Sequence, residues 1–130
     1  MPDELARAGV SAHKNQPFML RLGFALRGLA HGLSRGASLK VQVAAAVAAL
    51  LALIALRPAP LWWALVLSAC AAVLSAELLN TAIEQLADAL HPHDSAAIRI
   101  VKDCAAAAVL VAVLGALAVG AALALQLIIN

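Results

Sequence analysis

Charged residues are scarce in this chain, and their scarcity excludes an ordinary soluble globular domain. Only 12% of the 130 residues are charged, 65% are hydrophobic, and the mean hydropathy is +0.96. Soluble domains carry about 25% charged residues. The net charge of +2 is too small to indicate a nucleic-acid partner. The length allows one domain, and the composition predicts a membrane protein.

Cysteines and phosphate-binding loops are also scarce or missing. The two cysteines, Cys70 and Cys104, are isolated, so their spacing predicts neither a metal site nor a disulfide. We interpret both as small apolar packing residues. The chain has no Walker A loop and no glycine loop of the protein-kinase type. Any nucleotide must therefore be bound by other means.

Three long apolar segments account for the high hydropathy. They are Val41–Leu56, Leu61–Leu79 and Cys104–Ile129, and the last has no charge. A helix needs about 20 residues to cross the hydrocarbon core of a bilayer. The first segment reaches that length if residues 38–40 join it, with Lys40 extending to the surface. The sequence therefore predicts an all-α integral membrane protein with transmembrane helices at residues 38–56, 61–90 and 95–129.

The segment before these helices has two parts. Residues 1–16 are polar and are predicted to form a mobile tail. Residues 17–36 are predicted to form an amphipathic helix, because Pro17 suits a first turn and an apolar face follows it. Its apolar face consists of Phe18, Leu22, Leu26, Leu29 and Leu33. Such a helix is suited to the membrane surface.

The basic residues predict the orientation, because Lys and Arg collect on the cytoplasmic side of a membrane. Eight of the nine lie before the first span or between the second and third, and only Arg57 lies between the first two. We therefore expect the N-terminus and the loop after Leu90 to face the cytoplasm. Nothing resembles a cleaved signal peptide, so insertion is expected to use the mature helices.

A polar stripe lies at the end of the second apolar segment. Five of the seven carboxylates fall between Glu77 and Asp103. Four residues lie at roughly 0°, 300°, 340° and 20° around a helix, namely Glu77, Asn80, Glu84 and Asp88. Ionisable groups in an apolar helix are costly and indicate function by default. Because no helix stop precedes Leu90, we expect the stripe to straddle the membrane–cytoplasm boundary.

The two glutamates of the stripe predict different roles. Glu77 and Glu84 lie about 10 Å apart along the axis, too far to share a proton or a metal ion. Glu77 is the deeper residue and suits a general base for a lipid hydroxyl. Glu84 lies nearer water and suits Mg²⁺, which takes one or two carboxylates together with nucleotide phosphates. The alternative is that these groups only pair across a helix bundle or cap helix ends.

The loop after the second span contributes further candidates. Pro92 disfavours helix at the preceding residue, and Asp94 or Ser95 can cap the third helix. Lys102 supplies a cation for phosphate, and Asn80 and Asp103 add hydrogen-bonding groups. The histidines of residues 91–93 lack a third metal ligand and are interpreted as loop residues. The alanine run at residues 105–108 predicts tight contact with another helix.

The segment ELLNTAIE at residues 77–84, followed by Asp88 and by Lys102 and Asp103, resembles the signature of the prokaryotic diacylglycerol kinase family. That family includes undecaprenol kinases. The resemblance extends from about Phe18 to the end of the third span. It implies a lipid kinase of the bacterial inner membrane that transfers the γ-phosphoryl group of ATP to a lipid alcohol. It also implies a homotrimer in which neighbouring subunits share active sites.

By motif position, the resemblance implies that Glu77 is the catalytic base and that Glu84 binds the metal ion at the ATP phosphates. It places Asn80, Lys102 and Asp103 at the nucleotide, with the loop residues His93, Asp94 and Ser95 nearby. The family also has an acid on its surface helix and often a second one close by, and these positions fall at about Gly36 and Gln42. No acid occurs between Glu4 and Glu77. The implied metal site is one carboxylate short.

Three functions remain open from the sequence. The first is phosphorylation of a lipid alcohol, either diacylglycerol or undecaprenol, with ATP and Mg²⁺. The second, suggested by the missing acid, is a catalytically weak or inactive relative that binds lipid or nucleotide. The third is conduction of protons or ions by a trimer through Glu77.

Overall fold

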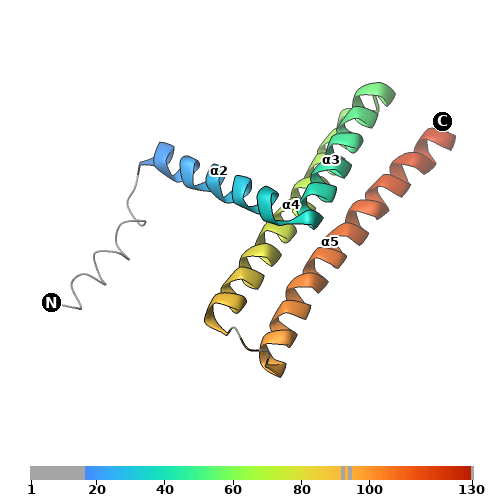
Figure 1. Cartoon of the computed structure of the whole chain (residues 1–130). Helices are drawn as coiled ribbons and strands as arrows, with labels where there is room; N and C mark the ends of the chain where they lie inside the picture. Colours follow the sequence, from blue (N-terminus) through green and yellow to red (C-terminus); the bar gives the residue numbers. More distant parts are fainter. Residues whose placement is uncertain (1–16, 92, 94, 130) are drawn as a thin grey trace. The chain divides into compact units, whose positions relative to one another are not determined.

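The computed structural model describes residues 17–91, 93 and 95–129, and its regular structure is entirely helical (Figure 1). The helices are α2 (Phe18–Arg35), α3 (Ala37–Leu56), α4 (Pro60–Leu90) and α5 (Ala96–Ile129). Three of them, α3, α4 and α5, are long and apolar enough to cross a membrane. The prediction of an all-α chain with three apolar spans is confirmed. The tail predicted at residues 1–16 lies outside the described residues.

The chain divides into two compact units, at Met1–Ser34 and Arg35–Asn130. Helix α2 makes up nearly all of the described part of the first unit. Its large apolar side chains Phe18, Met19 and Leu26 are exposed, and the Arg27 guanidinium lies 4.8 Å from the centre of the Phe24 ring. A position of α2 in the membrane surface stays a prediction.

The second unit begins with α3 and a tight turn. Gly36 precedes α3 in an extended conformation, and Arg57 ends it in the left-handed region with φ of 47°. The N–H of Arg57 donates to the carbonyl of Leu53 at 2.9 Å. Proline cannot continue a helix but suits a first turn, so Pro58 stops α3 and Pro60 starts α4. The chain therefore reverses direction directly.

Helix α4 is unbroken from Pro60 to Leu90, because no further proline and no glycine interrupts it. It ends at His91, whose N–H donates to the carbonyl of Ala87 at 2.9 Å. The Oγ atom of Ser95 accepts a 3.3 Å hydrogen bond from the N–H of Ile98 and so caps α5. The predicted cap is thus Ser95, while Asp94 lies outside the described residues.

Helix α4 is the centre of the second unit. It packs against both α3 and α5, whereas no Cα atom of α3 comes within 8 Å of one in α5. Near the Arg57 turn, Leu53, Val66 and Leu123 form a buried cluster. Trp62 Nε1 donates to Gln126 Oε1 at 2.6 Å beside it. Contacts made through α4 therefore hold α3 and α5 in place.

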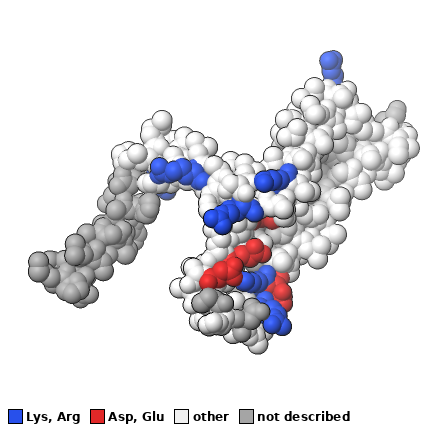
Figure 2. All heavy atoms as spheres, viewed as in Figure 1, with Lys and Arg blue, Asp and Glu red and all other residues white. Residues whose placement is uncertain are grey.

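The charges of α4 and α5 lie in the half of these helices that is away from the Arg57 turn (Figure 2). This half carries Glu77, which lies near the middle of α4, and also Glu84, Asp88, Arg99, Lys102 and Asp103. The remaining length of both helices has no charge. The fold therefore collects the predicted site residues of two helices on one side of a long apolar layer.

Candidate functional site

The site is built around Glu77, the only buried charged or polar side chain in the described part of the chain, at 3% exposure. The hydroxyl of Ser38, in the first turn of α3, donates a hydrogen bond to Glu77 Oε1. Burying a carboxylate is costly unless it is hydrogen-bonded. The hydroxyl therefore offsets part of that cost and fixes the direction of the carboxylate.

Ser38 is a site residue that the sequence did not reveal. A single hydroxyl near the start of an apolar helix is ordinary, and the sequence does not say which face of α3 meets α4. One signal was present, because Ser38 lies only two residues after Gly36, where the family pattern expects an acid. The contact became visible only with the packing of α3 on α4.

Asn80 and Glu84 form a second pair, farther along the stripe. Asn80 Nδ2 donates to Glu84 Oε1 at 3.0 Å. Asn80 Oδ1 is buried and has no hydrogen-bond partner among the described residues, which costs about 1–3 kcal/mol if it stays unpaired. An orphaned amide oxygen beside a carboxylate offers the hard oxygen ligands that Mg²⁺ takes. The pair therefore fits a divalent cation.

The protein ligands for such a cation are few. No group of three His, Cys, Asp or Glu side chains suited to a metal ion occurs in residues 17–91, 93 and 95–129. Mg²⁺ usually keeps several waters and binds through one or two carboxylates plus substrate phosphates. Asn80 and Glu84 thus suit a cation that arrives with an anionic ligand.

Lys102 and Asp88 form a third pair at the outer end of the stripe. Lys102 Nζ lies 2.5 Å from Asp88 Oδ1, and their side chains are 33% and 67% exposed. Such an exposed ion pair contributes about 0–1 kcal/mol, so a phosphate can compete with Asp88 for the ammonium group. Asp88 lies about 6 Å beyond Glu84 and about 16 Å beyond Glu77 along α4. Within one chain, Lys102 therefore lies closer to Glu84 than to Glu77 along the axis of α4.

The other predicted residues lie around the α4–α5 loop. Asp103 is exposed on α5, and His93 is exposed in the loop. Ser95 uses its hydroxyl oxygen to cap α5. Asp94 is outside the described residues. The structure thus brings together Glu77 with Ser38, Asn80 with Glu84, and Asp88 with Lys102.

The three pairs offer three kinds of chemistry at three depths. The buried carboxylate can accept a proton from a group that lies in the apolar layer. The amide and carboxylate oxygens can bind a cation, and the exposed ammonium group can bind an anion. Glu77, Asn80 and Glu84 lie along α4 and Lys102 lies on the neighbouring α5. Together these groups suit a reaction between an apolar alcohol and a water-soluble polyanion.

Comparison with known proteins yields one family. The family model described as prokaryotic diacylglycerol kinase matches residues 23–124. The match covers most of the chain and includes all three pairs of the site. No curated protein and no solved structure matches the chain significantly.

Proposed function

Because the chain belongs to the prokaryotic diacylglycerol kinase family, we propose that it transfers the γ-phosphoryl group of ATP to the hydroxyl of a membrane lipid. Membership of a kinase family implies ATP and a divalent metal ion. The observation that carries the proposal is the buried Glu77 carboxylate, fixed by Ser38 on the same stripe as Asn80 and Glu84. Diacylglycerol and undecaprenol are the two candidate acceptors.

In the proposed reaction, the lipid hydroxyl oxygen attacks the γ-phosphorus of ATP. The new O–P bond forms while the bond to the β,γ-bridging oxygen breaks, and ADP leaves with that electron pair. Glu77 accepts the hydroxyl proton as general base. Ser38 donates to Oε1, which leaves Oε2 to receive the proton.

The remaining pairs position the nucleotide. Glu84 and Asn80 would hold Mg²⁺, which supplies positive charge to the phosphate oxygens when bound. Lys102 exchanges its exposed partner Asp88 for a phosphate oxygen of ATP. Asp103 would help to hold the nucleotide, and the loop residues His93, Asp94 and Ser95 would lie near it. These roles follow the motif positions of the family.

We also propose a homotrimer with shared active sites, with the N-terminus and the α4–α5 loop in the cytoplasm and the chain in the bacterial inner membrane. The distribution of Lys and Arg supports the orientation. Small residues support the assembly, because in the alanine run only Ala105 is buried within one chain, while Ala106, Ala107 and Ala108 are exposed. Small exposed residues let another membrane helix approach closely.

A direct assay tests the proposed function. Purified protein in lipid nanodiscs receives radiolabelled ATP, Mg²⁺ and either diacylglycerol or undecaprenol. Labelled phospholipid is the expected product. Nucleotide binding without turnover would favour the weak or inactive relative, for which the small ligand set around Glu84 is the specific reason. Ion flux without lipid product would favour conduction.

Restoring the missing acid should improve the metal site. Gly36 has φ of −89°, which any residue adopts, and a carboxylate at a helix N-terminus is favourable. Gly36→Glu is expected to raise activity or to lower the Mg²⁺ concentration for half-maximal rate, by up to about tenfold. Mg²⁺ titrations measure the change, with Gly36→Gln as the uncharged control. Equal curves for both variants would place the metal ion away from Gly36.

Removing the Ser38 hydroxyl should slow the chemical step. Ser38→Ala is expected to lower kcat about tenfold, equal to about 1.4 kcal/mol, because Glu77 loses the hydrogen bond that orients it. The KM for ATP should stay unchanged, since the nucleotide binds at the Glu84 end. Ser38→Thr keeps a hydroxyl and should retain most of the activity. A Thr variant as slow as the Ala variant would contradict the role of the hydroxyl.

A further inference from the structure

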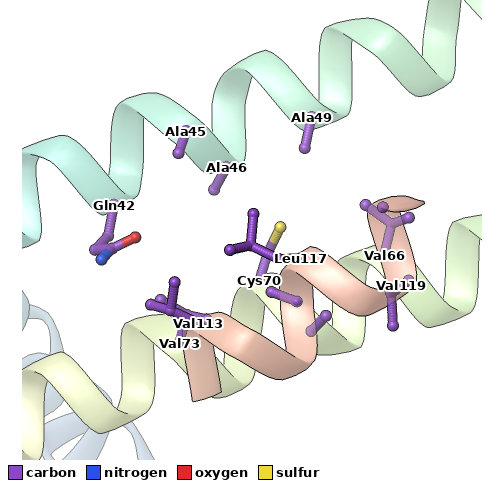
Figure 3. Close-up of a pocket in the computed structure, with 13 residues that line it drawn as sticks. Gln42, Ala45, Ala46, Ala49, Val66, Cys70, Val73, Val113, Leu117 and Val119 are labelled. Carbon is purple, nitrogen blue, oxygen red and sulfur yellow. The ribbon is translucent and has the colours of Figure 1, made fainter. Parts of the chain in front are cut away.

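An apolar groove of about 310 Å³ lies between α3 and α5, with α4 as its floor (Figure 3). Of its thirteen lining residues, Gln42 is the only one with an amide side chain, and the others are Ala, Val, Leu, Gly and Cys. A neighbouring groove of about 270 Å³ shares Ala49, Val66 and Gly120 with it and continues towards Leu56 and Leu127. Together they form an apolar path along the spans.

The packing of α3 on α4 places one end of this groove close to Ser38 and Glu77. Ser38 bonds to Glu77, and Gln42 and Val73 lie one helical turn deeper on the two antiparallel helices. Both line the groove, and Figure 3 shows the Gln42 side chain at one end, pointing from α3 into the groove. One turn corresponds to about 6 Å. The groove therefore begins just beneath Glu77 and leads away from the nucleotide end.

Gln42 is an unusual residue for this place. Its side chain makes no hydrogen bond among the described residues, although it lies in a helix that is otherwise apolar from Val41 to Leu56. Unpaired amides are costly in hydrocarbon, and polar side chains inside a span usually have a polar partner. Leucine would fill the same space without that cost. The amide therefore indicates a polar partner in the groove.

The two candidate lipids differ at this distance from the hydroxyl. In an acylglycerol, ester carbonyls lie a few bonds from the reacting hydroxyl, and hydrocarbon follows. In a polyprenol, only hydrocarbon follows the hydroxyl-bearing carbon. With the hydroxyl at Glu77 and the chain in the groove, an ester carbonyl comes to the depth of Gln42, whereas a polyprenol leaves the amide unpaired.

Resting on the proposed kinase function, we propose that Gln42 determines acceptor specificity. Its amide N–H donates a hydrogen bond to an ester carbonyl of an acylglycerol whose hydrocarbon chain occupies the groove between α3 and α5. The acceptor is thus an ester-linked glycerolipid. Gln42 adds binding energy for this lipid and takes no part in proton transfer.

Matched acceptors test the contact. Wild type and Gln42→Leu are compared in nanodiscs on diacylglycerol, on a dialkylglycerol of equal chain length that lacks carbonyls, and on a polyprenol. Wild type is expected to prefer the diester over the diether about tenfold in kcat/KM, as one hydrogen bond provides. Gln42→Leu should remove that preference by raising KM for the diester, with KM for ATP unchanged. Gln126→Leu, the same change at the far end of the spans, should keep it.

Three results would overturn the proposal. The first is equal use of diester and diether by wild type, and the second is a wild-type preference for the polyprenol. The third is an equal loss on all acceptors in Gln42→Leu together with a changed subunit count, because the amide would then face a second copy of the chain.

A measurement of lipid binding in the absence of ATP tests the Gln42 contact independently of the kinase function. Native mass spectrometry of wild type and Gln42→Leu measures retention of diester and diether lipid. A Gln42-dependent preference in a protein without kinase activity would refute the proposed function and support the contact. Active enzyme that retains both lipids equally would support the function and refute the contact.

Discussion

Glu77→Gln is expected to lower lipid phosphorylation by about 10²–10⁴-fold, the range that a positioned general base contributes. Glutamine has the shape of glutamate and can still accept the Ser38 hydrogen bond, but it cannot accept a proton from the lipid hydroxyl. Nucleotide binding should be unchanged, because Asn80 and Glu84 are intact. Initial rates with labelled ATP, beside equilibrium binding of a non-hydrolysable analogue, measure both quantities.

Two controls show whether the loss of activity in Glu77→Gln comes from the missing base or from a disturbed fold. Ser75→Ala removes an exposed hydroxyl from the same helix and should leave the rate within about a factor of two. Thermal unfolding in detergent should show that Glu77→Gln is at least as stable as wild type, because a buried charge is removed. A variant that folds normally and keeps more than about a tenth of the wild-type rate would exclude Glu77 as the base.

Glu84→Gln is expected to raise the Mg²⁺ concentration for half-maximal activity by about 10–100-fold. The next carboxylate of the stripe, Asp88, lies one turn farther on and pairs with Lys102. Beside Glu84, the neutral Asn80 oxygen then remains as a ligand. A glutamine still accepts the hydrogen bond from Asn80 Nδ2, so the local packing is preserved while the charge is lost. Mg²⁺ titrations at saturating ATP, repeated with Mn²⁺, measure the shift.

Asp88→Asn is the matched control for Glu84. It removes a carboxylate one turn farther along the same helix, where Asp88 pairs with Lys102. Removing this ion pair should leave the Mg²⁺ requirement unchanged and should lower the KM for ATP slightly, because Asp88 no longer competes with phosphate for Lys102. Identical Mg²⁺ curves for Glu84→Gln and wild type would place the metal ion elsewhere.

The three long apolar helices were predictable because length and hydropathy determine them. A run of apolar residues near 20 in length has few alternatives to a membrane helix, and the Arg57–Pro60 turn marks where one span ends. The continuation of α4 to Leu90 was also predictable from the sequence, because no proline or glycine follows Pro60 within the helix. The polar stripe from Glu77 to Asp88 then follows from the helical period.

The partners of the stripe could not be predicted. Beyond Gln42, helix α3 is apolar on all sides, so most of its sequence does not mark the face that meets α4. The Ser38–Glu77 bond and the position of Gln42 in the groove both depend on that rotation. The ion pair of Lys102 with Asp88 is different, because a short loop places the start of α5 beside the end of α4. This pair could have been predicted from the sequence.

In the proposed membrane topology, the turn at Arg57–Pro60 also sets how deep Glu77 lies in the bilayer. Glu77 follows Pro60 by seventeen residues, which is about 26 Å of helix, and the hydrocarbon thickness of a bilayer is about 30 Å. The depth of the carboxylate therefore depends on its fixed distance from the Pro60 end of α4, which would lie at the opposite surface of the bilayer. A thinner bilayer would lift it among the headgroups, and a thicker one would submerge it out of reach of ATP. In the proposed topology, the acyl-chain length of the surrounding lipids would therefore change the rate of the proposed reaction.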